Sequence, residues 1–383
     1  MKQLGIYIHI PFCKSKCKYC DFVSFQGKEA KQDDYIECLL KEIEKQKWDE
    51  INKKYKVTTI YIGGGTPSFI DSKHIEKILK LLKEKLQTNL NNEIEVTIEV
   101  NPGTANKEKL TKYKEVGVNR LSIGLQSTNN KILHDIGRIH TFEEFIETYN
   151  TAKEIGFENI NVDLMLALPN QTIQDLKESL EKIIELNPNH VSIYSLILEE
   201  GTPFFELEQA GKLNLPDEEL ERQMYWYVKN KLEIAGYNHY EISNFAKIGK
   251  ESKHNLNCWN QEEYLGFGLA SHSYFDNKRF SNTNNLELYI KNINENNQEK
   301  NIELHETQTI EDKKKEYMLL GLRKIEGVSI SVFKKRFIDN PIYIFKNELA
   351  TLVEEDLIEV DIDSIKLTNK GLDLANIVWE KFV

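Results

Sequence analysis

Residues 6–20 have the sequence IYIHIPFCKSKCKYC, a short apolar run that leads directly into three cysteines. Cys13, Cys17 and Cys20 form a C-x3-C-x2-C motif, and lysines alternate with them in the same loop. Thiolates this close together repel one another unless a cation binds them, so the spacing predicts a metal site.

Two kinds of metal site fit this spacing. A [4Fe–4S] cluster usually has four cysteine ligands, so three thiolates would leave one iron open to an outside ligand. The alternative is a structural zinc site that His9 or His254 completes. Five cysteines in a long chain do not indicate a disulfide framework, and we expect Cys38 to be a small core residue in a helix.

Short β-rich runs alternate with amphipathic helical segments over the first 240 residues. This alternation predicts an α/β fold with a parallel sheet and crossover helices, and places ligands at the carboxyl ends of the strands. Six units are too few for a closed eight-stranded barrel, so a partial barrel and an open sheet both fit. The predicted strands are Leu4–Ile10, Val57–Ile62, Ile94–Val100, Arg120–Leu125, Asn159–Leu164 and His190–Leu196, and the predicted helices include Ser72–Leu86, Lys107–Val116, Phe142–Ile155 and Ile173–Leu186.

The pattern changes after about residue 245, and we expect three regions. Residues 1–245 form the large domain, residues 246–304 connect it to the rest, and residues 305–383 form a smaller, mostly helical C-terminal domain. A hairpin around DIDS gives this tail a winged-helix-like pattern. Winged helices often bind DNA, but a net charge of −11 favours a structural or docking role and predicts no nucleic-acid partner.

No apolar run approaches the roughly 20 residues that span a bilayer. The N-terminus also lacks the shape of a signal peptide. We therefore expect a cytoplasmic protein.

A glycine-rich turn, GGGTP at residues 63–67, follows the second predicted strand. Residues without Cβ allow backbone groups to approach a small zwitterion closely. Together with the cysteine motif, this turn makes the chain similar to the radical S-adenosylmethionine (SAM) superfamily. The resemblance implies a partial (β/α)6 TIM-like barrel and favours the cluster, whose open iron binds SAM, over zinc. It also implies SAM contacts from Tyr7, Tyr19, Gly64, Gly65, Thr66, Glu99, Gln126, Arg138 and Asp163.

Longer motifs narrow the resemblance to the HemN-like group. These motifs include YIHIPFC, IYIGGGTPS, RLSIGLQS, NVDLMLALP and YEISNFAK, and the tail resembles the C-terminal domain of the group. The coproporphyrinogen III dehydrogenases of this group carry a further cysteine where this chain has Phe22, and a long N-terminal extension, whereas this chain begins twelve residues before Cys13. Both differences indicate the HemW branch, whose members are understood as heme-binding proteins.

That branch typically carries a His-Asn-x-x-Tyr-Trp motif linked to heme. Here the segment is HNLNCW, with His254 and with Cys258 in place of the tyrosine. Imidazole and thiolate are both good ligands for heme iron, so either side chain is a candidate, and a purely structural loop is the alternative.

The resemblance therefore implies a heme chaperone with a [4Fe–4S] cluster and bound SAM. Its expected partners are heme, heme-receiving proteins and an electron donor. A peripheral contact with membrane respiratory proteins and a homodimer are both compatible with this interpretation. The alternative is a radical SAM enzyme that acts on a tetrapyrrole, such as a coproporphyrinogen III dehydrogenase or a methyltransferase.

Overall fold

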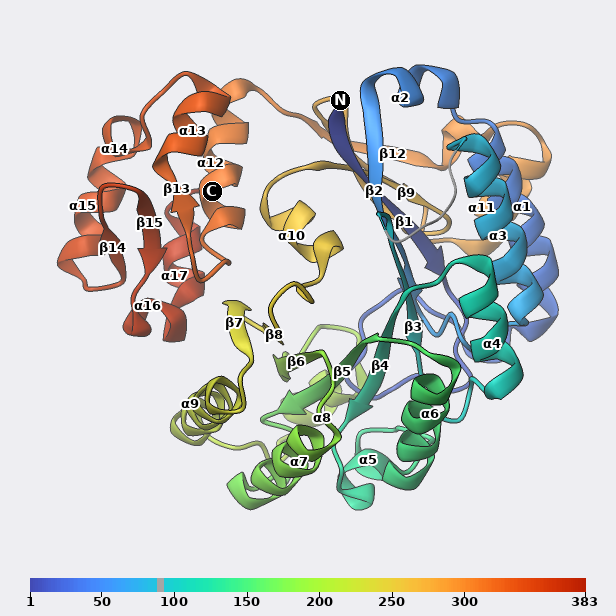
Figure 1. Ribbon diagram of the computed structural model, residues 1–383, viewed down its shortest axis with the longest axis horizontal. Helices are drawn as coiled ribbons and strands as arrows, with labels where there is room; N and C mark the ends of the chain where they lie inside the picture. Colours follow the sequence, from blue (N-terminus) through green and yellow to red (C-terminus); the bar gives the residue numbers. More distant parts are fainter. Residues whose placement is uncertain (88–92) are drawn as a thin grey trace.

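The computed structural model describes residues 1–87 and 93–383 (Figure 1). A 12-stranded sheet dominates the large part of the molecule, and a 3-stranded sheet belongs to the C-terminal part. Each part has its own hydrophobic core.

Six consecutive strands of the large sheet are parallel, and helices connect them. The predicted strands and helices are confirmed, with boundaries that differ by a few residues. The strands are β1 (Lys2–Ile10), β2 (Tyr55–Gly64), β3 (Glu95–Val100), β4 (Arg120–Gln126), β5 (Asn159–Leu166) and β6 (His190–Ser195). The helices between and after them are α1 (Gln32–Glu44), α2 (Trp48–Lys54), α3 (Ser72–Lys85), α4 (Lys107–Val116), α5 (Asn130–Asp135), α6 (Phe142–Ile155), α7 (Ile173–Leu186), α8 (Pro203–Gln209) and α9 (Glu218–Ile234).

Local sequence explains where the crossover helices begin and end. Helix α6 starts with a capping box, in which the Thr141 side chain accepts from the Glu144 amide and Glu144 binds back to the Thr141 amide. It ends at Gly156, which has a φ of 94° that glycine adopts without strain. Helix α7 repeats this capping box with Thr172 and Asp175.

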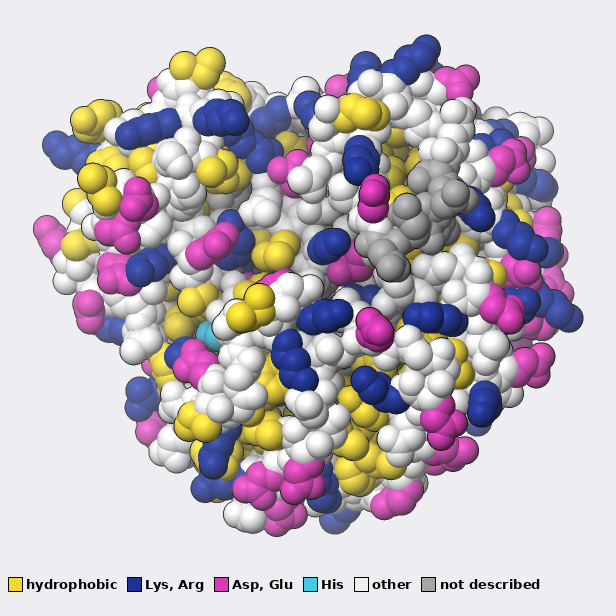
Figure 2. Space-filling view, in the orientation of Figure 1, with side chains coloured by type: hydrophobic (Ala, Val, Ile, Leu, Met, Phe, Trp, Pro, Cys, Tyr) yellow, Lys and Arg dark blue, Asp and Glu magenta, His cyan; other side chains and the backbone are white. Residues whose placement is uncertain are grey.

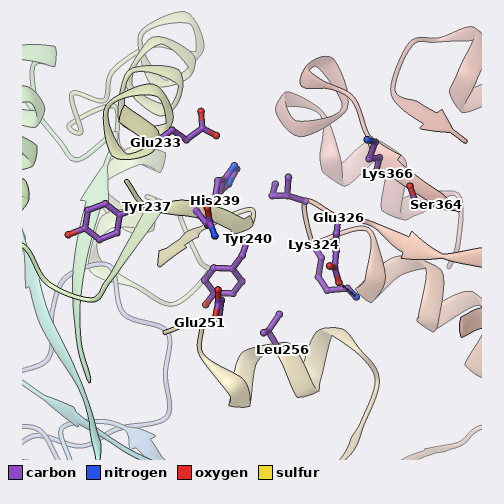
Figure 3. Close-up of a pocket in the computed structure, with 12 residues that line it drawn as sticks. Glu233, Tyr237, His239, Tyr240, Glu251, Leu256, Lys324, Glu326, Ser364 and Lys366 are labelled. Carbon is purple, nitrogen blue, oxygen red and sulfur yellow. Dashed lines mark hydrogen bonds and ion pairs between the residues drawn. The ribbon is translucent and has the colours of Figure 1, made fainter. Parts of the chain in front are cut away.

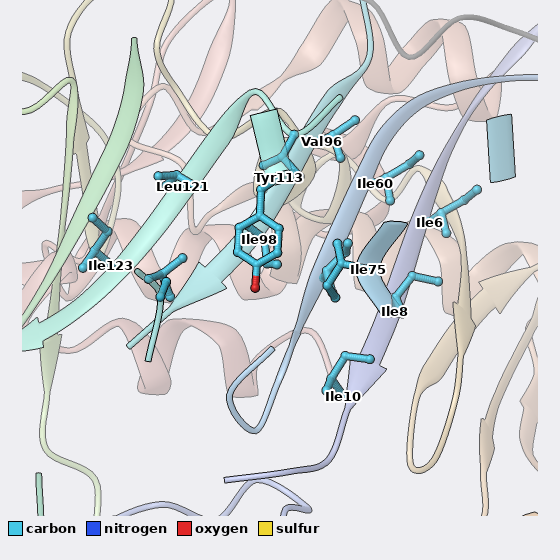
Figure 4. Packing of buried hydrophobic residues seen from close by; sticks show 14 of the residues in the cluster. Ile6, Ile8, Ile10, Ile60, Ile75, Val96, Ile98, Tyr113, Leu121 and Ile123 are labelled. Atoms are coloured by element: carbon cyan, nitrogen blue, oxygen red, sulfur yellow. The ribbon is translucent and has the colours of Figure 1, made fainter. Parts of the chain in front are cut away.

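The two faces of the large sheet differ in character because side chains alternate along each strand. One face is apolar and packs against the helices, as Figure 4 shows for Ile98 and Ile123 beside Ile75 and Tyr113. Burial of each such side chain contributes about 1.5–3 kcal/mol. The alternate residues, among them Thr59 and Ser122, are polar and face the inside of the curved sheet, where helix α10 (Lys253–Trp259) packs against β2.

The segment 246–304, for which we expected a connection, adds strands to the main sheet. Strand β9 (Glu263–Phe267) pairs parallel with β1, and β10 (His272–Phe275), β11 (Lys278–Asn282) and β12 (Ile302–Thr307) extend that edge. Strands β7 (Asn238–Glu241) and β8 (Asn244–Ala246) extend the other edge. The edge strands β12 and β7 do not pair with each other within the described residues, so the sheet is an open, partial barrel.

The C-terminal part packs helices around the sheet β13–β15–β14. The hairpin that the sequence predicts is present as β14 (Ile358–Val360) and β15 (Ser364–Leu367), and β13 is Val328–Ser329. Two backbone hydrogen bonds, Ile242 N to Arg323 O and Ile325 N to Tyr240 O, join this part to the large sheet. Its helices are α12 (Ile310–Gly321), α13 (Ile330–Phe337), α14 (Pro341–Ile344), α15 (Lys346–Glu354), α16 (Asn369–Asp373) and α17 (Ala375–Glu380), and α11 (Leu286–Asn294) precedes them.

The visible surface mixes positive and negative side chains and carries no broad basic face (Figure 2). Among the described residues, no helix has both the length and the apolar character to cross a bilayer.

Candidate cluster and SAM site

The three motif cysteines lie in one loop at the carboxyl end of β1. Backbone bonds from Cys13 N to Phe25 O (3.0 Å) and from Phe25 N to Pro11 O (2.8 Å) close this loop. The thiol of Cys20 has its pKa raised to about 11, chiefly by burial, and the nearby Cys17 and Cys13 thiols add to the shift. The Cys13 and Cys17 thiols therefore lie near enough to Cys20 to affect its pKa, although within the described residues no three His, Cys, Asp or Glu side chains are arranged to hold a single metal ion.

Two side chains donate hydrogen bonds to the sulfurs. Thr66 Oγ1 lies 3.5 Å from Cys13 Sγ, and Arg138 Nη1 lies 3.6 Å from Cys17 Sγ. Donors and a guanidinium charge at these positions stabilise thiolates and the negative charge of a cluster. Tyr19 lies beside Cys17 and Arg138, and burial raises the pKa of its phenol.

His9, one candidate for a fourth zinc ligand, is already committed to the fold. Its Nε2 is 2.8 Å from Val23 O, and its Nδ1 is 3.0 Å from the Tyr7 hydroxyl. Burial lowers the pKa of His9 to about 4, so the ring is neutral at physiological pH. With both nitrogens engaged, His9 does not complete a zinc site.

The glycine turn packs directly on the cysteine loop. Gly65 N donates to Ile10 O and Thr66 N donates to Phe12 O, each at 2.9 Å. Gly64 has a φ of 110°, and a Cβ at this position would lie 2.5 Å from Cε1 of His9. A Cβ at Gly65 would lie 2.9 Å from Ile10 O. These glycines are therefore required to seat the turn against β1, in addition to any approach to SAM.

The carboxylate of Glu99 also binds the glycine turn. It accepts from the Tyr61 hydroxyl at 2.9 Å and from Gly64 N at 3.1 Å. Burial is the main cause that raises its pKa to about 7, and nearby Asp163 contributes. Asp163 accepts from Asn161 Nδ2 at 2.7 Å, and burial also raises its pKa.

Two predicted SAM residues carry buried polar atoms without partners. Gln126 Oε1 and Arg138 Nε lack hydrogen bonds, and Gln126 has a φ of 75°, in the left-handed region. Such atoms cost about 1–3 kcal/mol each unless a ligand or water satisfies them. Unpaired groups next to the cysteine loop therefore fit a polar cofactor such as SAM.

Sequence analysis missed Asn101, which links several of these groups. It donates to Thr66 Oγ1 at 3.0 Å and accepts from Arg138 Nη2 at 3.1 Å. Its position directly after β3, in the segment VNPGT, was the available signal. Tyr61 was missed because an aromatic residue within an apolar strand resembles a core residue.

The HNLNCW segment forms helix α10. Ser252 caps it, and Glu95 accepts the amides of Lys253 (3.1 Å) and His254 (3.2 Å). The His254 ring is 8% exposed, bonds to Thr59 Oγ1 through Nδ1 at 2.9 Å, and stacks on Tyr61 with centroids 5.2 Å apart. Burial lowers the pKa of His254 to about 4.

The last two residues of α10, Cys258 and Trp259, lie near side chains other than those around His254. Burial raises the pKa of the Cys258 thiol to about 11, and Arg279 opposes this shift. The guanidinium of Arg323 lies between two indole rings, 4.4 Å from the centroid of Trp259 and 4.5 Å from that of Trp379. Trp259 therefore attaches α10 to the C-terminal domain.

Comparison with known proteins agrees with this geometry. Residues 7–183 match the Radical SAM superfamily, and residues 309–374 match the HemN C-terminal domain. Fold and cysteine loop thus define a radical SAM protein.

Two curated relatives align along nearly the whole chain. Heme chaperone HemW of Bacillus subtilis (strain 168) is 39% identical, covering 98% of both chains. Heme chaperone HemW of Lactococcus lactis subsp. lactis (strain IL1403) is 38% identical, covering 100% of this chain and 98% of the relative. The chain therefore belongs to the HemW family.

A solved structure supports the fold. The coproporphyrinogen III oxidase HemN from Escherichia coli, described as a radical SAM enzyme, superposes with a TM-score of 0.86 at 25% identity. The alignment covers 100% of this chain and 90% of HemN. Both the barrel and the C-terminal domain thus have counterparts in one solved protein.

Proposed function

We propose that this protein is a heme chaperone that binds heme and delivers it to respiratory or other heme proteins. The observation that carries the proposal is the full-length similarity to heme chaperones at 38–39% identity. Phe22, at the position of the further cysteine of the dehydrogenases, is 58% exposed and offers no sulfur ligand, which supports the same choice.

The cluster and SAM belong to this proposal. Cys13, Cys17 and Cys20 would hold a [4Fe–4S] cluster, and SAM would bind beside it, where Gln126 and Arg138 have unpaired atoms. Other predicted residues would either surround SAM or position the side chains that contact it: Tyr7, Tyr19, Gly64, Gly65, Thr66, Glu99 and Asp163. When bound, a cluster of this type supplies the electron that cleaves SAM.

Several finer points are part of the same proposal. The chaperone would act in the cytoplasm, receive electrons from a donor protein and touch membrane respiratory proteins peripherally, and a homodimer is compatible with the fold. His254 and Cys258 remain predicted candidates for the heme ligand. The bond of His254 to Thr59 and its stacking on Tyr61 leave Nε2 as the nitrogen that would have to reach iron.

A second function, a radical SAM enzyme acting on a tetrapyrrole, is favoured by one observation. The unpaired atoms of Gln126 and Arg138 surround a polar site next to the cysteines in a fold that matches HemN with a TM-score of 0.86.

One experiment separates the two functions. Protein reconstituted with iron and sulfide without oxygen is given hemin in one sample, and SAM, reductant and coproporphyrinogen III in another. We expect a Soret band at stoichiometric hemin and no protoporphyrinogen. Turnover of coproporphyrinogen without hemin uptake would reject the chaperone and establish the enzyme.

A further inference from the structure

Arg120, the first residue of β4, is a buried arginine without a partner. The residue is 2% exposed, and its Nε is buried without a hydrogen bond. In the part of the chain that the structure describes, its guanidinium forms no hydrogen bond and no ion pair. A guanidinium has five N–H donors and stays charged at every physiological pH. Burial of such a group is costly unless an acceptor pairs with it, so Arg120 indicates a missing acceptor.

Two more unpaired polar atoms lie beside Arg120 on the neighbouring strands. Arg120 is in register with Thr97 of β3 and with Asn159 of β5. The Thr97 hydroxyl and the Asn159 Oδ1 are both buried without a hydrogen-bond partner. The next residues along two of these strands, Leu121 and Ile160, belong to the core under the helices, so the polar side chains face the inside of the curved sheet. Three adjacent strands therefore present unsatisfied polar groups side by side.

The carboxylates on the same inner face bind other groups. Glu95 accepts the first amides of α10, Glu99 binds the glycine turn, and Asp163 accepts from a side-chain amide of β5. Burial raises the pKa values of Glu99 and Asp163, and the charge of Arg120 opposes both shifts. This attraction acts without a direct contact, so it does not supply the acceptors that the Arg120 donors lack.

We propose that Arg120, Thr97 and Asn159 form a binding site for an oxyanion, a carboxylate or a phosphate, inside the curved sheet. Arg120 pairs with two oxygens of the anion, and the Thr97 hydroxyl donates to one of them. Asn159 donates through Nδ2 after a rotation that exchanges its two amide atoms. The site lies where β4 and β5 begin, whereas the cysteine loop and the glycine turn lie where β1 and β2 end. It requires neither heme, cluster nor SAM, and so goes beyond the proposed function.

The cavity between β7 and the C-terminal domain, of about 920 Å³, provides the route to this site (Figure 3). Tyr240 lines the cavity, and its hydroxyl lies 2.7 Å from Nε2 of His190. Burial lowers the pKa of His190, and the charge of Arg120 adds to this shift, so Arg120 lies near the inner side of this pair. Side chains of both signs line the cavity, among them Lys324 and Glu251, so selection for an anion falls to Arg120.

Urea unfolding of the full-length protein tests the site. Samples contain chloride alone, or chloride with added phosphate or acetate at equal ionic strength. We expect the wild-type midpoint to rise with phosphate or acetate concentration, and the anion with the larger effect identifies the chemistry. Arg120→Met should lose this response, and in chloride alone it should be at least as stable as the wild type, because it removes a buried unpaired charge. Phosphate also stabilises proteins generally, so the difference between the two proteins is the measurement.

Two threonines supply matched variants. Thr97 and Thr59 are both 0% exposed, but Thr97 Oγ1 has no partner, whereas Thr59 Oγ1 lies 2.9 Å from His254 Nδ1. Thr97→Val should keep the midpoint in chloride and weaken anion affinity about tenfold, because only the complex loses a hydrogen bond. Thr59→Val should lower the midpoint and keep the anion response.

Equal anion responses in the wild type, Arg120→Met and Thr97→Val would overturn the site and leave Arg120 with a purely structural role. No sample contains hemin or SAM, so this outcome would not bear on the proposed chaperone.

Discussion

The cysteine loop after β1 and helix α10 each carry a sequence motif, yet the structure uses them differently. Around the cysteine loop, hydrogen-bond donors point at sulfur, and Gln126 and Arg138 keep buried atoms unpaired. In α10, His254 is bonded to Thr59 and stacked on Tyr61, and the Trp259 ring packs on Arg323 while its Nε1 stays buried without a partner. Motif residues left unsatisfied indicate a ligand, whereas satisfied ones also serve the fold.

The largest expected effect concerns the cysteine loop. Cys13→Ser, Cys17→Ser and Cys20→Ser should each abolish the cluster, because each removes one of three thiolate ligands. The measurement is iron and sulfide content after anaerobic reconstitution, expected at roughly four of each per wild-type chain. Cys38→Ser is the control, since Cys38 lies in α1 near Ile290 O and Asn294, and it should retain the full complement. Stoichiometric zinc in place of iron would contradict the cluster.

The next effect concerns the contact between the glycine turn and β1. Gly64→Ala would place a Cβ 2.5 Å from His9 in a left-handed conformation, so the turn must move. We expect SAM affinity to fall at least about tenfold by calorimetry on cluster-loaded protein. Gly156→Ala shares a positive φ but has open space around it, so it should cost about 1 kcal/mol of stability and leave SAM binding intact. Equal SAM affinity in both variants would place SAM elsewhere.

Much of the region around the cysteine loop and the glycine turn could be predicted from the sequence alone. The strands, crossover helices, cysteine loop and glycine turn are local features, and their side chains meet because parallel strands end at one edge. The features that the sequence could not show depend on contacts between residues that lie far apart in the chain. Strand β9 joins β1 across more than 250 residues, Asn101 bridges Thr66 and Arg138, and the cavity forms only where β7 meets the C-terminal domain.

A smaller effect tests whether the neutral His254 side chain stabilises the native fold. Its pKa is lowered from 6.5 to about 4, so its neutral form stabilises the native state fully above pH 6.5, and this contribution falls as the pH drops toward 4. Between pH 6.5 and pH 5 the loss is on the order of 2 kcal/mol. His254→Gln should therefore be less stable than wild type at pH 7.5 and lose that deficit by pH 5 in urea unfolding. A deficit independent of pH would mean that His254 does not titrate with unfolding.

The smallest effect is expected at Cys258, where the family pattern has tyrosine. Burial raises the pKa of its thiol to about 11, so the thiol is protonated in the free protein, as that of Cys20 is. Its described neighbours, Arg279 and Tyr264, lie on strands β11 and β9, so the thiol is surrounded by side chains of the sheet edge. Cys258→Ser should therefore leave the Soret band of the hemin complex unchanged. A spectral change in this variant would show instead that the Cys258 thiolate ligates the iron.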